Sequence, residues 1–222
     1  MRINAISGAV STSVVNGLPP FDPTLLGIVA DQPIIAAYER EPDRSTFSDL
    51  YRIELDGTAR LFGDAGGSIY RLWPSSSSSA LVFVAGRSSG ACYSTDDIGV
   101  IAAAPDGDIE VNVPPQPLGD EFAVVRSAQM AADSSLSAAI SPLGCDDDGM
   151  IEDREPLAER YLFKDGRWSP TGARGFDVQS VAGGIAEVKR SDERSVPGAL
   201  ALVNDGGRLL LAPQIEGLVA RP

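Results

Sequence analysis

The clearest candidates for chemistry in this sequence are carboxylates that cluster around one glycine. The segment CDDDGMIEDRE is the most highly charged stretch of the 222-residue chain. Aligned on Gly149, three of its side chains take positions similar to ligand positions of a calcium-binding loop: Asp146, Asp148 and Glu155. Gly144 stands where an aspartate would supply the first ligand, so a solvated acidic loop is the alternative interpretation. We therefore predict no required cofactor and one candidate calcium site.

Histidine is absent from the sequence, which restricts the chemistry that this chain can perform alone. Ser-His-Asp and Cys-His catalysis both need an imidazole, and so do most catalytic zinc and non-haem iron sites. We expect Asp96 and Asp97 to lie on the corresponding loop of the preceding repeat, facing the acidic patch CDDDGMIEDRE. Two carboxylates across a cleft suggest a glycoside hydrolase, but nothing in the sequence fixes their separation or supplies a wall for a sugar to stack on. We therefore predict that the protein is not an enzyme, and glycoside hydrolysis is the weakest alternative.

Charge and hydropathy limit the partners of the protein. The sequence has 31 acidic and 18 basic residues, a net charge of -13, which would repel the phosphate backbone of a nucleic acid. No apolar run approaches the roughly 18 to 20 residues that cross a bilayer, and the first 20 residues lack the compact apolar block of a secretion signal. We expect no nucleic acid partner and no membrane insertion.

Asp-Gly pairs recur between apolar, β-rich runs at four places in the sequence. In YRIELDGTARLF, residues 51–62, two alternating runs flank Asp56-Gly57, the strongest short-range signal for a tight type I′ hairpin turn. Similar runs flank three more pairs: Asp106-Gly107, Asp165-Gly166 and Asp205-Gly206. The pairs follow one another at separations of 50, 59 and 40 residues, which indicates a repeat that carries loop insertions.

A second pair of short apolar runs lies upstream of each Asp-Gly hairpin. Each repeat therefore holds four strands, with tight turns between the first two and the last two and a variable polar connection in the middle. Meanders of this length are typical of β-propeller blades. We predict an all-β, β-propeller-like fold of four to five four-stranded antiparallel blades. A β-sandwich is the alternative, because short strands at regular spacing fit it as well.

The repeats resemble those of TolB-like and WD40-like β-propellers. The tyrosine and the Asp-Gly pair of the outer hairpin in such blades are matched twice, by Tyr51 with Asp56-Gly57 and by Tyr161 with Asp165-Gly166. Ser134 and Ser135 precede the third inner strand in a similar way. The resemblance extends over residues 25–213, and it implies that binding takes place through loops at the faces of the propeller.

The two ends of the chain extend beyond the four repeats. Residues 1–20 include the β-permissive run RINAISGAVSTSVV and lead into the proline-rich stretch NGLPPFDP, residues 16–23. They form either an extended arm that packs elsewhere or a strand that closes the ring of blades. We expect residues 21–222 to form a single propeller-like domain.

The two cysteines, Cys92 and Cys145, lie at matching places, each in the middle connection of its repeat. Such loops of neighbouring blades emerge on the same rim, and a disulfide can form if the Cα atoms approach within about 7 Å. A disulfide would indicate an oxidising compartment, and two unpaired thiols would indicate a reducing one.

Together these features favour a non-enzymatic binding or assembly module. We expect it to be extracellular or periplasmic and to present loops to a protein or a glycan. The alternative is a structural component of a phage tail, a virion or a surface filament, docked into a larger particle through residues 1–20.

Overall fold

The structure of the chain is a computed structural model. It describes residues 2–3, 10–11, 14–42, 46–73, 80–88, 94–118, 123–131, 134–142, 158–175, 177–181, 184–188, 198–204 and 207–215. The described part of the chain contains no helix of the length and apolarity that crossing a membrane requires.

The described strands form four separate antiparallel sheets and one small hairpin. Blade 1 consists of β3 (Phe21–Val29), β4 (Gln32–Tyr38), β5 (Asp49–Ile53) and β6 (Ala59–Asp64). Blade 2 consists of β7 (Ser68–Trp73), β8 (Ala80–Ser88), β9 (Ser94–Ala103) and β10 (Ile109–Asn112). Blade 3 consists of β11 (Ala123–Met130), β12 (Leu136–Pro142), β13 (Ala158–Lys164) and β14 (Arg167–Gly175). Blade 4 consists of β15 (Asp177–Val181), β16 (Gly184–Val188), β17 (Gly198–Asn204) and β18 (Gly207–Ile215), and the hairpin pairs β1 (Arg2–Ile3) with β2 (Val10–Ser11).

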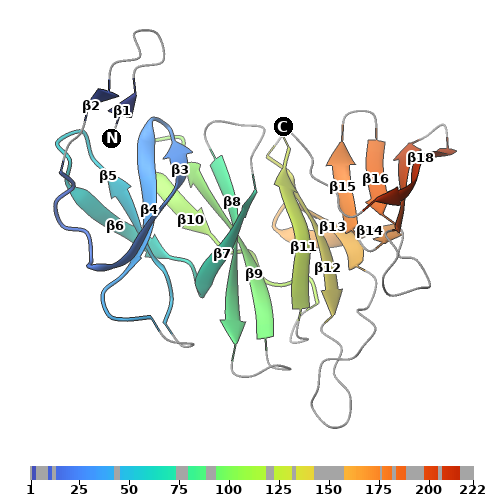
Figure 1. The fold of residues 1–222 in the computed structure, drawn as a ribbon, viewed down its shortest axis with the longest axis horizontal. Helices are drawn as coiled ribbons and strands as arrows, with labels where there is room; N and C mark the ends of the chain where they lie inside the picture. The colour runs from blue at the N-terminus through green and yellow to red at the C-terminus, as the bar shows by residue number, and fades with distance from the viewer. Residues whose placement is uncertain are drawn as a thin grey trace.

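Each blade is a meander in which the strands are hydrogen-bonded in chain order, so its first and last strands lie at the edges. The blades follow one another along the longest axis of the molecule, and contacts join neighbouring blades (Figure 1). The described sheets form an open row and do not close into a ring. The prediction of an all-β fold with four-stranded antiparallel blades is confirmed, and the structure is not the β-sandwich given as the alternative.

The Asp-Gly pairs in the described residues lie where the two outer strands of a blade meet, as predicted. Asp165 and Gly166 join β13 to β14 with φ angles of 52° and 77°, the two left-handed residues that a type I′ turn requires. In blades 1 and 2 the prediction of a type I′ turn is wrong. In each of these two pairs only the glycine, Gly57 or Gly107, has a positive φ. The N–H of this glycine donates a hydrogen bond to the carbonyl oxygen three residues earlier. The Asp205-Gly206 pair lies outside the described residues.

Strand β8 contributes to two apolar cores because its side chains alternate between the two faces of blade 2. Phe83 faces blade 1, where it is fully buried in a core with Leu26, Val29, Ile34 and Leu50. Val82 and Val84 face blade 3, in a core with Val125, Leu136 and Ile140. Blade 2 is therefore covered on both faces by neighbouring sheets.

The Phe83 ring occupies the space above a glycine on the neighbouring strand. Gly99 on β9 is the cross-strand partner of Phe83, and a Cβ placed on Gly99 would lie 2.0 Å from the ring atom Cζ. Only a glycine leaves room for the ring at this position. The Phe83 ring therefore packs over Gly99 on the face of blade 2 that contacts blade 1.

Candidate functional site

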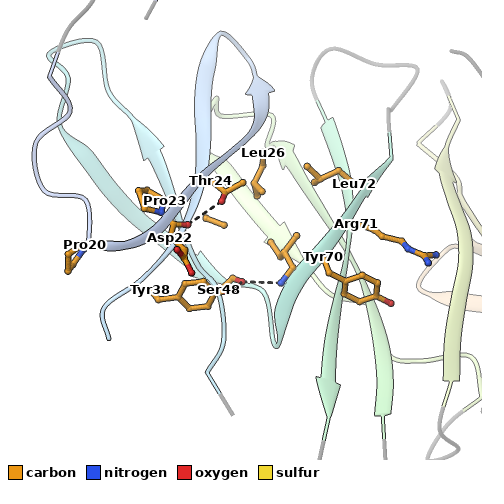
Figure 2. A pocket seen from close by; sticks show the side chains of 12 residues that line it. Pro20, Asp22, Pro23, Thr24, Leu26, Tyr38, Ser48, Tyr70, Arg71 and Leu72 are labelled. Carbon is orange, nitrogen blue, oxygen red and sulfur yellow. Dashed lines mark hydrogen bonds between the residues drawn. The ribbon is translucent and has the colours of Figure 1, made fainter. Parts of the chain in front are cut away.

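A groove lies between the first strands of blades 1 and 2. It encloses a cavity of about 730 Å³ with walls from β3 and β7, and Figure 2 shows it from close by. Its lining mixes apolar, aromatic and charged side chains: Pro20, Asp22, Pro23, Thr24, Leu26, Ala36, Tyr38, Ser48, Ile69, Tyr70, Arg71 and Leu72. A volume of this size lies within the range of small-ligand sites in proteins.

The wall formed by β3 departs from regular strand geometry. Its pairing with β4 shifts register between Phe21 and Thr24, and Asp22, inside this bulge, has a φ of 45°. The Thr24 hydroxyl donates a hydrogen bond of 3.2 Å to the carbonyl oxygen of Asp22. A left-handed aspartate followed by Pro23 stores strain of about 1 to 3 kcal/mol, and residues held in this way concentrate at ligand sites. The groove therefore contains a locally strained backbone segment.

The floor of the groove is held by Ser48, which lies in the connection between β4 and β5. The Ser48 hydroxyl accepts a hydrogen bond of 3.0 Å from the Ile69 N–H at the start of β7, and its Oγ lies 3.0 Å from the Tyr38 hydroxyl. The Ser48 N–H also donates to the carbonyl of Gly67. This buried serine thus fixes the separation of the two walls.

The wall formed by β7 is bulged at Tyr70, where pairing with β8 shifts register. The Tyr70 ring is half exposed, and its hydroxyl bonds to the carboxylate of Asp96. Burial, followed by this hydrogen bond, raises the pKa of Tyr70 well above its ordinary value of 10.0, so the hydroxyl stays protonated. Arg71 lies over the same ring, with its guanidinium carbon 5.6 Å from the ring centroid.

Blade 2 holds the backbone of blade 3 at one residue, Val125. The Asp96 carboxylate accepts a hydrogen bond of 2.8 Å from the Val125 N–H, and the Arg71 guanidinium donates one of 3.3 Å to the Val125 carbonyl. In Figure 2 the Arg71 side chain points away from blade 1, in agreement with this contact. Burial raises the pKa of Asp96, against the opposing effects of its bonds from Tyr70 and Val125. We refer to Asp96, Arg71 and Val125 as the clamp.

Asp96 and Asp97 do not lie on a loop as predicted, and the acidic patch that they were expected to face lies outside the described residues. Asp96 and Asp97 are neighbours on β9, so their side chains point to opposite faces of the sheet. Asp96 belongs to the clamp, and Asp97 forms an ion pair of 2.8 Å with Arg87. Both side chains are buried and bonded within the protein, so neither carboxylate faces its neighbour across a cleft.

The remaining predicted site residues lie outside the described residues: Cys92, Cys145, Asp146, Asp148 and Glu155. The disulfide and the calcium site therefore stay predictions. Within the described residues, no group of three or more acidic or cysteine side chains is placed to hold a metal ion.

The groove itself was missed by sequence reasoning. Its walls come from strands in different repeats, and nothing in the sequence indicates how closely two blades approach. One available signal was the Asp22-Pro23 pair in a strand of blade 1, since proline within a strand marks an edge or a bulge.

Comparison with known proteins shows a likeness to solved structures, including two of acylaminoacyl peptidases. No protein-family model and no curated protein matches the chain. One structure is an acylaminoacyl peptidase of Pyrococcus horikoshii, with 11% identity and a TM-score of 0.49. Another is an acylaminoacyl peptidase in complex with Z-Gly-Gly-Phe-chloromethyl ketone, with 12% identity and the same TM-score of 0.49. In both cases 86% of this chain aligns with 32% of the matched chain, so this chain spans about a third of their length.

This comparison corrects the prediction of a non-enzymatic module. Both matched structures are of a peptidase, which is an enzyme. The prediction went too far because the lack of histidine excludes imidazole catalysis only within this chain, while a domain without a catalytic base can still be part of an enzyme. The non-enzymatic binding module is therefore not carried forward, nor are the virion component and glycoside hydrolase given as its alternatives. A likeness of this degree assigns no activity to the chain.

Proposed function

We propose that the protein binds an extended peptide in the groove between β3 and β7. The observation that carries this proposal is that both walls are edge strands of their sheets. An edge strand presents backbone N–H and C=O groups that its own sheet leaves unpaired, and an extended peptide can add to such an edge.

The side chains of the groove suit the same kind of ligand. Leu72 on β7 is 41% exposed, and its side chain points toward blade 1, whereas the Tyr70 side chain points away from it (Figure 2). Covering exposed apolar side chains contributes about 25 cal/mol for each Å² removed from water. Asp22, on the opposite wall, adds a carboxylate that can accept a hydrogen bond from a peptide N–H or pair with a cationic side chain. An extended peptide with apolar side chains meets both requirements.

We also propose that the blades are of the TolB-like or WD40-like type. The support for this type is that Tyr51 on β5 and Tyr161 on β13 both lie on the third strand of their blade, shortly before an Asp-Gly turn. The position is the one that the outer hairpin of such repeats uses.

A binding assay with two matched variants tests the proposal. Fluorescence anisotropy with labelled extended peptides rich in apolar residues is expected to show binding to the wild-type protein. Leu72→Glu places a charge in the groove and is expected to weaken binding by about tenfold or more, which corresponds to about 1.4 kcal/mol. Leu55→Glu is the control, because Leu55 is 90% exposed in the turn between β5 and β6 and lies outside the groove.

Two results would contradict the proposal: no binding by any such peptide, or equal binding by the two variants. Circular dichroism of both variants confirms that each remains folded. Mass spectrometry of the peptides after incubation adds a separate readout, because cleavage would identify the bound peptide as a substrate.

A further inference from the structure

The groove between β3 and β7 presents a negative charge to a ligand. Two charged side chains line it, Asp22 and Arg71. Arg71 donates a hydrogen bond of 3.3 Å to the Val125 carbonyl of blade 3, and its side chain points away from blade 1 (Figure 2). Asp22 is exposed, and no basic side chain in the described part of the chain forms an ion pair with its carboxylate. The charge of Asp22 is therefore available to a ligand.

A bulge in β3 places Asp22 in the lining of the groove. Between Phe21 and Thr24, two residues of β3 stand opposite one residue of β4. Consecutive side chains of a regular strand point to opposite faces, but a bulge interrupts this alternation and redirects a side chain. Three consecutive residues, Asp22, Pro23 and Thr24, accordingly line the groove.

The groove has a polar end and an apolar end. Figure 2 shows Asp22, Tyr38 and Ser48 toward one end and Leu26 and Leu72 toward the other. The hydroxyls of Tyr38 and Ser48 share one hydrogen bond of 3.0 Å but carry two protons, so one proton can still be donated to a ligand. Ser48 is only 1% exposed, so Tyr38 is the hydroxyl that a ligand can reach. The polar end therefore offers one carboxylate acceptor and one hydroxyl donor.

Given the peptide site proposed for this groove, we infer that a bound peptide carries a cationic group, an ammonium or a guanidinium, that pairs with Asp22. Hydrogen bonds between a cation and a carboxylate are roughly twice as strong as those between neutral groups. The net charge of -13 also attracts cationic peptides and repels acidic ones. Apolar side chains of the same peptide lie at the end formed by Leu26 and Leu72.

Fluorescence anisotropy with apolar peptides, labelled at the carboxyl end, tests this preference. One series is acetylated at the amino terminus and differs at a single position, which is lysine, norleucine or glutamate. Wild-type protein is expected to bind the lysine peptide about fivefold to tenfold more tightly than the norleucine peptide, and the glutamate peptide most weakly. A norleucine peptide with a free amino terminus shows whether a terminal ammonium provides the same gain.

Two matched variants identify the carboxylate. Asp22→Asn keeps the size of the side chain and removes its charge, so it is expected to abolish the preference for a cation and to leave binding of the norleucine peptide unchanged. Asparagine also tolerates the left-handed backbone of the bulge. Asp31→Asn is the control, because Asp31 is exposed in the turn between β3 and β4, has a φ of 64° and lies outside the groove. This variant is expected to keep the preference.

Equal binding of the cationic and the neutral peptides, or a preference that survives in Asp22→Asn, would overturn the pairing with Asp22 and leave the peptide site itself standing. Absence of binding by every peptide would instead contradict the peptide site, and the pairing with it. A gain from lysine identifies a side chain as the source of the cation, and a gain from the free amino terminus identifies the end of the peptide.

Discussion

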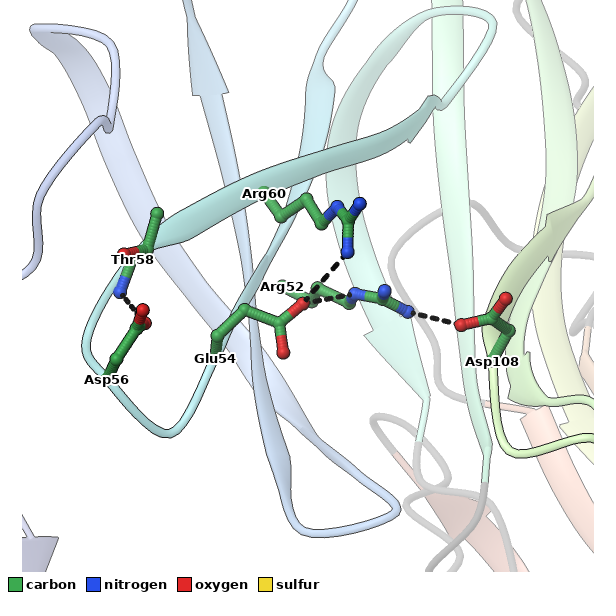
Figure 3. A network of polar contacts seen from close by, with 6 residues as sticks. All are labelled: Arg52, Glu54, Asp56, Thr58, Arg60 and Asp108. Carbon is green, nitrogen blue, oxygen red and sulfur yellow. Dashed lines mark hydrogen bonds and ion pairs between the residues drawn. The ribbon is translucent and has the colours of Figure 1, made fainter.

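The two described junctions that flank blade 2 are built differently. Between blades 1 and 2 an apolar core is bordered by an ion pair at the surface, in which Arg52 donates to Asp108 across 3.1 Å (Figure 3). Between blades 2 and 3 the apolar core is joined to the clamp, in which Asp96 is only 5% exposed. The first junction leaves a groove and has an exposed carboxylate, Asp108, in its ion pair, whereas the second buries the carboxyl group of Asp96 against the backbone of the neighbouring blade.

This difference separates a junction suited to binding from one suited to holding blades together. Asp108 is 69% exposed, and exposed ion pairs contribute little to stability. A buried carboxylate that accepts a backbone hydrogen bond is costly to disturb, because its removal leaves a buried N–H unpaired. We therefore expect the clamp to be rigid and the groove side of blade 2 to adapt more readily to a ligand.

The largest expected effect is at the apolar core of the first junction. Phe83→Ala removes a fully buried ring and is expected to lower the free energy of unfolding by about 3 to 5 kcal/mol. Chemical denaturation measures this loss. Gly99→Ala is also expected to destabilise the protein, because its new Cβ meets the Phe83 ring, and this cost should shrink in the Phe83→Ala background. Additive costs for the two substitutions would contradict the contact.

The next effect is the loss of the clamp. Asp96→Ala leaves the Val125 N–H unpaired and removes the partner of the Tyr70 hydroxyl, so it is expected to cost about 2 to 3 kcal/mol. Asp97→Ala is the matched comparison on the same strand, since its partner Arg87 is half exposed and can be hydrated. Thermal unfolding compares the two variants, and an equal or larger loss for Asp97→Ala would contradict the account of the second junction.

The clamp also predicts a pH dependence. Burial raises the pKa of Asp96 above its ordinary value of 3.8, so the folded protein binds this proton more tightly than the unfolded chain. The contribution of this group to stability is therefore greatest at low pH and is lost as the pH rises through the raised pKa. Relative to Asp96→Asn, which does not titrate, the wild-type protein should lose stability over this interval. Parallel stability curves for the two proteins would show that Asp96 is not perturbed.

The smallest expected effect is at the ion pair of the first junction. Asp108→Ala is expected to change the free energy of unfolding by less than about 1 kcal/mol, and added salt should reduce the change further. Denaturation at low and high ionic strength measures both values. A loss as large as that of Asp96→Ala would remove the difference between the two junctions.

The hairpins could be predicted from the sequence because their signals are local. An Asp-Gly pair predicts a turn because glycine readily adopts the left-handed conformation that the turn needs. The alternation of apolar and polar residues on either side identifies the flanking strands. The turn type differs from the prediction in two of these hairpins. In blades 1 and 2 the aspartates, Asp56 and Asp106, instead accept a hydrogen bond from the N–H two residues later, which suits a longer turn.

The groove and the clamp could not be predicted because both depend on how blades approach one another. The sequence suggests Asp96 as a catalytic candidate, yet the neighbouring blade buries it against Val125. The left-handed φ of Asp22 likewise depends on its bulged pairing with β4. A repeat pattern identifies the units, but the surfaces between units depend on side chains that are distant in sequence.

Hydrogen exchange of backbone amides, followed with and without a bound apolar peptide, tests the central claim most directly. If the peptide adds to the open edges of β3 and β7, exchange should slow at residues 21–29 and 68–73 and remain unchanged in blade 3. Protection confined to other strands, or binding that leaves both segments unprotected, would contradict a peptide site in the groove.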